Sequence, residues 1–119
     1  ATIESVAYQT YDLFEAMKHD GLRPRLVKVD GGMVMNNWFS QFLSDVVDIK
    51  VLRPKVQETT ALGAAFMAGL QIGVYKSLKD ISKNWHIDKN FTPKMKSKQR
   101  INLVKGWSKA IKKTLTKTI

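Results

Sequence analysis

The sequence predicts an α/β fold in which short strands alternate with helices. Two short runs rich in β-branched residues, at 25–29 and 48–54, are each followed by a segment in which apolar residues recur every three or four positions. The helical segment between the two runs is long enough for a crossover, so we expect parallel strands and a right-handed connection. A length of 119 residues and a hydrophobic fraction of 44% suit one ordinary globular domain.

A first helix is expected from the start of the chain to about His19. The residues that carry its apolar spacing are Ile3, Val6, Ala7, Thr10, Phe14 and Met17. Asp20 and Gly21 follow, a pair that commonly ends a helix. Neither a capping residue nor an initiating methionine precedes the pattern, so we expect the chain to be a piece of a longer protein.

The first strand, "RLVKV" at 25–29, leads into Asp30-Gly31-Gly32, and a second helical pattern begins at once. Consecutive glycines here have two interpretations: a tight turn, or a place where phosphate approaches free backbone N–H groups at a helix N-terminus. The stretch is neither a P-loop nor the complete dinucleotide-binding pattern, so the residues alone leave both open. Asn36 lies about one turn into the expected helix, where it either reaches the same ligand or is a solvated or capping amide. Asp30 is expected to cap the helix rather than to bind a metal.

The remaining elements follow the same alternation. The second helix has an apolar stripe of Trp38, Phe42 and Val46 and a polar stripe of Asn37, Gln41 and Asp45. After the strand at 48–54, a third helix capped by Thr59 or Thr60 is rich in small residues, which favour close packing against a sheet or another backbone. Residues 76–93 are expected to form a polar, lysine-rich connection, and the last helix begins near 94–97. Its apolar stripe is Ile101, Val104, Trp107, Ile111 and Leu115. We therefore divide the chain into 1–75, with helix, strand, helix, strand and helix, and 76–119, with the connection and an appended amphipathic helix.

The net charge of +10 comes from the second part of the chain. Residues 1–75 hold 7 basic and 8 acidic side chains, net −1, whereas residues 76–119 hold 13 and 2, net +11. A basic surface suits nucleic acid. Lysines scattered along a helix are more typical of a solvated face, because base reading favours arginine and polar amides. Nucleic-acid binding is therefore the less favoured interpretation.

Few residues suit catalysis or metal binding. The chain has no cysteine, and His19 and His86 lie far apart without metal-ligand spacing. Glu4 and Asp12 have no evident partner, and His86 beside Asp88 is a common pairing in loops. We find no nucleophile or general base, so we assign no catalytic residue and no metal site. The longest apolar run is too short for a membrane span and no secretory signal opens the chain, so we expect a cytoplasmic protein.

Four stretches together resemble the C-terminal part of the glycerol kinases, a branch of the FGGY carbohydrate kinases. They are "ATIESVAYQTYDLFEAM", "VDGGMVMNNWFSQFLSD", "RPKVQETTALGAAFMAGLQIGVY" and "FTPKM…RINLVKGWSKAIKK". The DGG…N element is common to the wider family, whereas the "ETTALGAA" run and the terminal "GWSKAIK" favour the glycerol kinases. The resemblance implies the C-terminal part of a ribonuclease-H-like domain of the actin/hexokinase-like ATPase fold, lacking its first three strands and carrying an appended C-terminal helix.

The resemblance also implies a function. The complete protein is expected to use ATP and Mg²⁺ to convert glycerol to glycerol 3-phosphate, with this chain supplying part of the nucleotide site. Gly32 resembles the glycine that lies against the ATP phosphates, Gly31 allows the close approach, and Asn36 resembles the asparagine that contacts the nucleotide. The general base and the glycerol-binding residues are expected outside this chain, so the chain alone should be inactive.

The expected partners are glycerol, ATP and further copies of the same protein, with no nucleic acid. The alternative within the family is another FGGY sugar kinase, such as a pentulose kinase. The alternative from another class is a small basic nucleic-acid-binding module.

Overall fold

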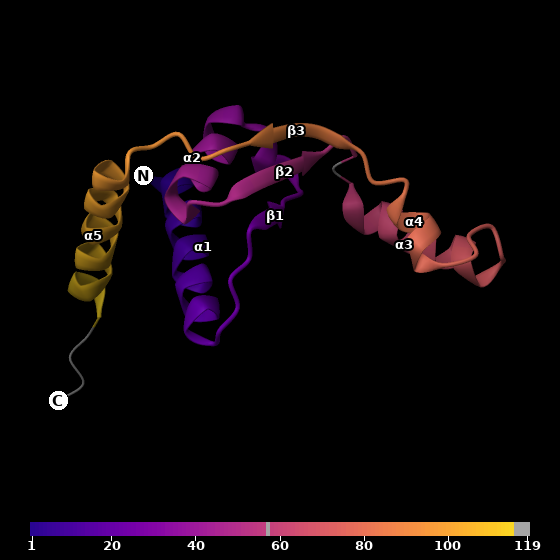
Figure 1. The fold of residues 1–119 in the computed structure, drawn as a ribbon, viewed down its shortest axis with the longest axis horizontal. Coiled ribbons are helices and arrows are strands. Elements are labelled where there is room, and N and C mark those ends of the chain that lie inside the picture. Colours follow the sequence, from indigo (N-terminus) through magenta and orange to yellow (C-terminus); the bar gives the residue numbers. More distant parts are fainter. Residues whose placement is uncertain (57, 116–119) are drawn as a thin grey trace.

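The computed structural model describes residues 1–56 and 58–115. Its elements, in chain order, are α1 (Thr2–His19), β1 (Leu26–Lys28), the 3₁₀ helix η1 (Gly32–Met35), α2 (Asn37–Val47), β2 (Lys50–Pro54), α3 (Thr59–Gln71), α4 (Leu78–Ser82), β3 (Ile87–Phe91) and α5 (Ser97–Thr114). Figure 1 shows a central body of α1, α2 and three strands, with α3 and α4 extending to one side and α5 on the other. No helix among the described residues is long and apolar enough to cross a membrane.

The strands form one sheet in the order β1-β2-β3. β1 and β2 are parallel, with Val27 opposite Val51, as the crossover through α2 predicted. β3 pairs antiparallel with the other edge of β2, with Phe91 opposite Val51. The α/β fold class is therefore confirmed, and the expectation of only two strands in this segment was wrong.

The stretch at 76–93 is more than a connection, because it contains α4 and β3. Along β3 only Phe91 is buried, so the strand lacks the apolar alternation by which a half-buried strand is recognised. Its place in the sheet comes from backbone pairing with β2 and from the single inward phenylalanine. The start of β2 also differs from the prediction. Asp48 ends α2 in a left-handed conformation (φ 58°), and the strand begins only at Lys50.

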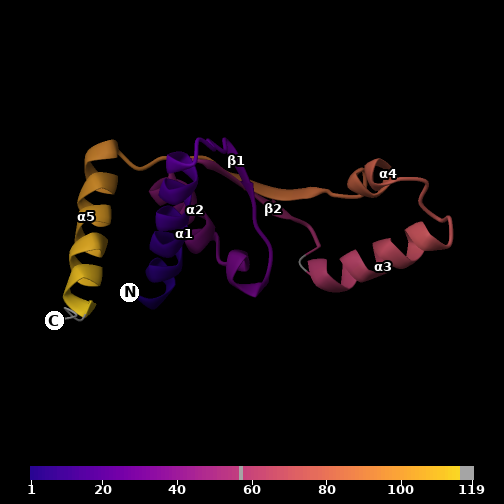
Figure 2. The same ribbon diagram turned by 90° about the horizontal axis from the view of Figure 1, so that it is seen from below.

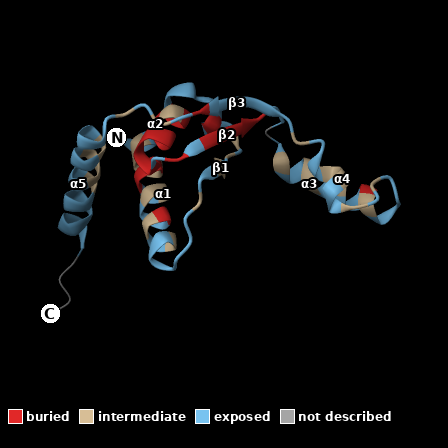
Figure 3. Cartoon of the chain, in the orientation of Figure 1, coloured by how far each residue is buried: buried red, intermediate tan, exposed pale blue. Residues whose placement is uncertain are grey.

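The core lies where α1, α2 and the sheet meet. α1 runs beside α2, and α2 packs against β2 and β3 (Figure 2). Figure 3 shows the buried residues gathered on these elements. Ala7, Val46 and Val51 are fully buried, one each from α1, α2 and β2. The predicted apolar stripes are therefore confirmed in part: Ala7, Phe14, Phe42 and Val46 are buried, whereas Ile3 and Trp38 are exposed.

α3 and α4 lie away from this core (Figures 1 and 2). Only Gly69 of α3 is buried, so of the two packings expected for its small residues, against a sheet or against another backbone, the first is absent within the described residues. Gly69 does allow one close approach, because a Cβ built there would lie 2.8 Å from Cδ2 of Tyr75 in the following turn. A Cβ at Gly63, by contrast, would meet nothing within 4 Å. Within the described residues, the small surface of α3 is thus used only near its own C-terminal end.

The polar stripe of α2 holds the segment that leads into α5. The Asp45 side chain is 8% exposed, and its Oδ1 accepts hydrogen bonds from the backbone N–H groups of Lys94 and Met95, the second at 3.1 Å. Gln41 Nε2 donates to the same oxygen and to the carbonyl of Thr92. A buried carboxylate with three donors is well satisfied, so Asp45 acts as an anchor for the backbone between β3 and α5.

α5 contacts α1 mainly through Trp107. The indole stacks on the Tyr8 ring at 5.5 Å, and its N–H donates to Asp12 Oδ2 at 2.7 Å. Burial raises the pKa of the Tyr8 hydroxyl, and the charge of Glu4 adds to this effect. Asp12 therefore has a partner that the sequence did not reveal.

The apolar stripe predicted for α5 is only partly buried. Val104 and Trp107 pack against the core, together with Leu103, which lay outside the predicted stripe. Ile101, Ile111 and Leu115 are exposed. Within the described residues, the body therefore covers only the positions around Leu103 to Trp107 and not the whole predicted stripe. Lys117, one of the basic residues counted in this tail, lies outside the described residues.

Candidate functional site

A small cavity lies at the carboxyl end of β1. It has a volume of about 270 Å³ and is lined by residues of two segments: Asp30, Gly31, Gly32, Glu58, Thr59 and Thr60. One wall is the turn after β1 and the other is the beginning of α3. Open α/β sheets bind their ligands beyond the carboxyl ends of parallel strands, so this is the expected place for a functional site.

The two glycines of this turn differ in whether the backbone conformation requires a glycine. Gly31 has φ 89° and ψ 169°, a conformation essentially restricted to glycine. Gly32 does not have a positive φ of this kind, and a Cβ built on it would meet nothing within 4 Å. The backbone of this chain therefore requires glycine at position 31 but not at position 32. Position 32 is exposed and open, as a site of close ligand approach should be.

Free backbone N–H groups lie at this turn. η1 begins at Gly32; at its start the Val34 N–H donates to the Gly31 carbonyl, and at its end the Asn36 N–H donates to the Met33 carbonyl. No hydrogen bond within residues 1–56 and 58–115 uses the N–H of Gly31, Gly32 or Met33. On the opposite wall, the first N–H groups of α3 have no partner inside the helix. Two sets of free donors beside one cavity are the usual basis for binding an anion such as phosphate.

Asn36 lies at the far end of η1 from the glycines and does not line the cavity. It is the N-cap of α2, and its Oδ1 accepts hydrogen bonds from the N–H groups of Trp38 (2.9 Å) and Phe39 (3.3 Å). The prediction that a helix follows the glycines at once was wrong, because the 3₁₀ turn intervenes and places Asn36 at the helix boundary. The capping role, one of the two interpretations open from the sequence, is the observed one. It occupies the amide oxygen and leaves the amide N–H₂ group available to donate.

Asp30 does not cap a helix. Its carboxylate accepts a hydrogen bond from the hydroxyl of Thr59, which joins the end of β1 to the start of α3. Thr59 in turn is not the N-cap of α3: that position is Glu58, which makes no side-chain capping bond. The predicted capping roles of Asp30 and of Thr59 or Thr60 were therefore wrong, and the contact between Asp30 and Thr59 across the cavity was not predicted.

Ser40 and Arg53, which the sequence did not single out, hold η1 in place through hydrogen bonds to its carbonyl groups. The Val34 carbonyl accepts hydrogen bonds from Ser40 Oγ at 2.8 Å and from Arg53 Nη1 at 2.9 Å. Arg53 also donates to the Met35 carbonyl at 3.1 Å. On its other side it pairs with Asp88, with Nε and Nη2 lying 2.8 and 2.7 Å from Oδ2. The partner of Asp88 is thus Arg53, not the neighbouring His86.

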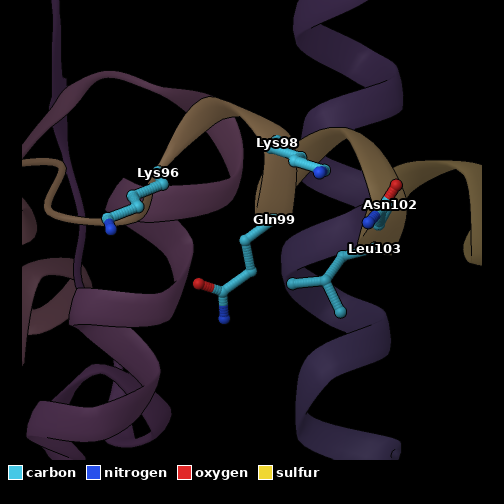
Figure 4. Close-up of a pocket in the computed structure, with 5 residues that line it drawn as sticks. All are labelled: Lys96, Lys98, Gln99, Asn102 and Leu103. Atoms are coloured by element: carbon cyan, nitrogen blue, oxygen red, sulfur yellow. The ribbon is translucent and has the colours of Figure 1, made fainter.

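The groove beside the start of α5 lacks comparable chemistry. This shallow groove of about 420 Å³ is lined by Lys96, Lys98, Gln99, Asn102 and Leu103 (Figure 4). Its side chains all come from α5 and the residue before it, and none is an acid or a nucleophile. Among the described residues, no group of three or more His, Asp or Glu side chains is placed to hold a metal ion. The cavity beside the glycines is the best candidate for a functional site, because it joins the glycine turn after β1 to the start of α3.

Comparison with known families identifies the chain. Residues 1–72 match the C-terminal domain of the FGGY family of carbohydrate kinases. The chain belongs to the FGGY carbohydrate kinases. This membership confirms the resemblance inferred from the DGG…N element and the stretches around it, and the α/β architecture seen here is that of the FGGY fold.

Individual relatives of this FGGY chain are glycerol kinases. The glycerol kinase of Gluconobacter oxydans is 51% identical over 117 residues, which are 98% of this chain and 23% of that protein. Glycerol kinase 1 of Pseudomonas aeruginosa is 50% identical over 113 residues, 95% of this chain and again 23% of the relative. The chain thus spans about a quarter of the length of the curated relatives it matches.

Solved structures of FGGY kinases share the fold. The crystal structure of Plasmodium falciparum glycerol kinase with ADP has a TM-score of 0.80 and 34% identity, over 97% of this chain and 23% of that one. The xylulose kinase of Lactobacillus acidophilus has a TM-score of 0.74 over 96% of this chain and 24% of that one. At 21% identity, this second likeness concerns the fold alone.

Proposed function

We propose that this FGGY chain is the C-terminal portion of an ATP-dependent glycerol kinase, which forms glycerol 3-phosphate, and that the chain supplies part of the nucleotide site. The glycerol kinase relatives at about 50% identity support the reaction. The observation that supports a nucleotide site here is the presence of a glycine at position 32. The chain's own backbone does not need a glycine there, yet the position is open, exposed and flanked by free N–H groups at a cavity.

The three residues of the proposed site have different roles. The Gly32 N–H would donate to a phosphate oxygen of ATP, and the unusual backbone of Gly31 would allow the phosphate to come close. Asn36 would contact the nucleotide through the amide N–H₂ group that capping leaves available. Positioning of this kind is most of what a protein supplies in phosphoryl transfer.

Magnesium fits this arrangement as a companion of the nucleotide. Mg²⁺ in kinases is commonly held by the substrate phosphates, water and one or two carboxylates, and when bound it neutralises phosphate charge. Asp30 and Glu58 line the cavity, so a nucleotide carrying its own cation suits the local charge better than a bare one. We assign no residue of this chain as a dedicated metal ligand.

The rest of the proposal concerns what this chain does not contain. We propose that its sheet belongs to a larger ribonuclease-H-like sheet, with three further strands beyond the free edge of β1, where Leu26 is 44% exposed. The division into residues 1–75 and 76–119 stays part of this proposal, with β3 joining the second part to the sheet. The general base and the glycerol site would lie in other parts of a cytoplasmic, homo-oligomeric enzyme that binds no nucleic acid.

The test is a glycine replacement in the complete kinase. Gly32→Val puts a branched side chain where the phosphate should approach, so the KM for ATP should rise by about tenfold or more while the KM for glycerol changes little. Gly106→Val is the matched control, because a Cβ at Gly106 also meets nothing within 4 Å but lies on α5, away from the cavity. An unchanged KM for ATP and an unchanged kcat in Gly32→Val would show that the glycines only form a turn.

A further inference from the structure

Arg53 is a buried charge with contacts in two directions. It lies in the central strand β2, and its side chain is 7% exposed. One side of its guanidinium faces the carbonyls of Val34 and Met35, and the other side faces the carboxylate of Asp88 on β3. A buried arginine is stable only when its donors are paired, so both sets of contacts are needed to keep it there.

The carbonyls that Arg53 holds belong to η1. This 3₁₀ helix has four residues, and hydrogen bonds within so short a helix are few and poorly aligned. Its position is therefore set by contacts from outside. The Val34 carbonyl accepts from both Ser40 and Arg53, and the Val34 side chain is 5% exposed. η1 is thus fixed from α2, β2 and, through Asp88, β3.

The same helix carries the free N–H groups of the candidate site at its other end. The Val34 N–H donates to the Gly31 carbonyl, and that carbonyl shares a rigid peptide plane with the Gly32 N–H, so holding Val34 in place limits the orientation of the Gly32 N–H. Preorganised donors bind a phosphate without first losing conformational freedom.

We propose that Arg53, aligned by Asp88, is a positioning residue for the nucleotide: it holds η1 so that the N–H groups at the glycine turn face the phosphates. This inference rests on the proposed nucleotide site and adds a role for β3. If the pair between Arg53 and Asp88 were purely structural, breaking it would lower the stability of the protein without selectively raising the KM for ATP.

Two variants of the complete kinase separate these roles. Asp88→Asn keeps the size of the side chain but removes the charge that aligns the guanidinium. Arg53→Lys keeps the positive charge, but a single ammonium group cannot reach the η1 carbonyls and Asp88 together. The matched control is Asp48→Asn, because Asp48 pairs with Arg100 at 2.8 Å and lies far from the cavity lining. Its left-handed backbone also suits asparagine.

The readouts are the KM for ATP, the KM for glycerol, and the hydrogen-exchange rates of the Val34 and Asn36 amides, which donate to the Gly31 and Met33 carbonyls. We expect Asp88→Asn and Arg53→Lys to raise the KM for ATP by about three- to tenfold, a part of what losing a charge-assisted hydrogen bond produces. Exchange in η1 should become faster, while the KM for glycerol stays within about twofold. Asp48→Asn should leave all three readouts at their wild-type values.

Gly32→Val is measured alongside to separate the two proposals. If it raises the KM for ATP but Asp88→Asn and Arg53→Lys do not, the positioning role is wrong and the nucleotide site stands. If none of the three variants changes the KM for ATP, both proposals are wrong. Equal changes in the KM values for ATP and glycerol would also overturn the positioning role, because they would indicate general loss of structure.

Discussion

Replacing Gly31 by alanine should destabilise the chain, whereas the same replacement at Gly32 should not. Gly31 has φ 89° and ψ 169°, and an alanine forced into such a region costs about 1–3 kcal/mol. At Gly32 the backbone is permissive and a Cβ would meet nothing within 4 Å. Alanine at a compatible glycine position stabilises a protein by about 0.4–1 kcal/mol, because the unfolded chain loses freedom. The two variants should therefore differ by about 1.4–4 kcal/mol in free energy of unfolding.

Urea unfolding of the chain, followed by circular dichroism, measures this difference directly. Gly106→Ala is a useful reference, because it replaces an open glycine inside a helix and should stabilise by about 1 kcal/mol. If Gly32→Ala destabilises the chain as much as Gly31→Ala, then Gly32 serves the fold itself. Its missing side chain would then no longer indicate room for a ligand, and the reasoning behind the nucleotide site would be refuted.

Three further predictions concern the rest of the chain. Asp45→Ala leaves the N–H groups of Lys94 and Met95 without their acceptor, so the free energy of unfolding should fall by about 2–4 kcal/mol in urea titrations; a loss under about 0.5 kcal/mol would contradict the anchoring role. The isolated chain should not phosphorylate glycerol in a coupled assay with Mg-ATP, because no general base was found in it; measurable turnover would disprove this. The isolated chain should also melt at a temperature that depends on its concentration, because β1 is an unpaired sheet edge and α3 exposes apolar surface such as Met67. A concentration-independent melt of a monomer in sedimentation would count against it.

The elements that the sequence predicted well are those that carry their own periodic pattern. α1 shows its apolar spacing over 18 residues, and the β-branched run of β1 ends at a proline on one side and glycines on the other. β3 has no such pattern, because four of its five residues are exposed and its stability comes from pairing with β2. The packing of α3 was predicted from small residues alone, but residue size does not say whether a partner surface exists in the same chain.

Only those parts of the candidate site that lie within one short stretch of sequence could be predicted. Gly31 and Gly32 are consecutive, and a glycine pair between a strand and a helix is visible in any sequence. The contact between Arg53 and Asp88 joins residues 35 positions apart, on strands whose pairing was not predicted. The one available signal was an arginine directly after Val51 and Leu52 in a predicted strand, because a charge buried in a sheet needs a partner. The sequence left the capping of α2 by Asn36 as one of two interpretations. It could not decide between them because the intervening 3₁₀ turn, which was not predicted, shifts the start of the helix by several residues.

The central claim is that the glycine turn after β1 binds the phosphates of the nucleotide. A crystal structure of the complete kinase with Mg-ADP tests it most directly. We expect a phosphate oxygen within hydrogen-bonding distance of the Gly32 N–H, about 2.7–3.2 Å from nitrogen to oxygen. A nucleotide bound elsewhere, with the Gly32 N–H facing only water, would contradict the account.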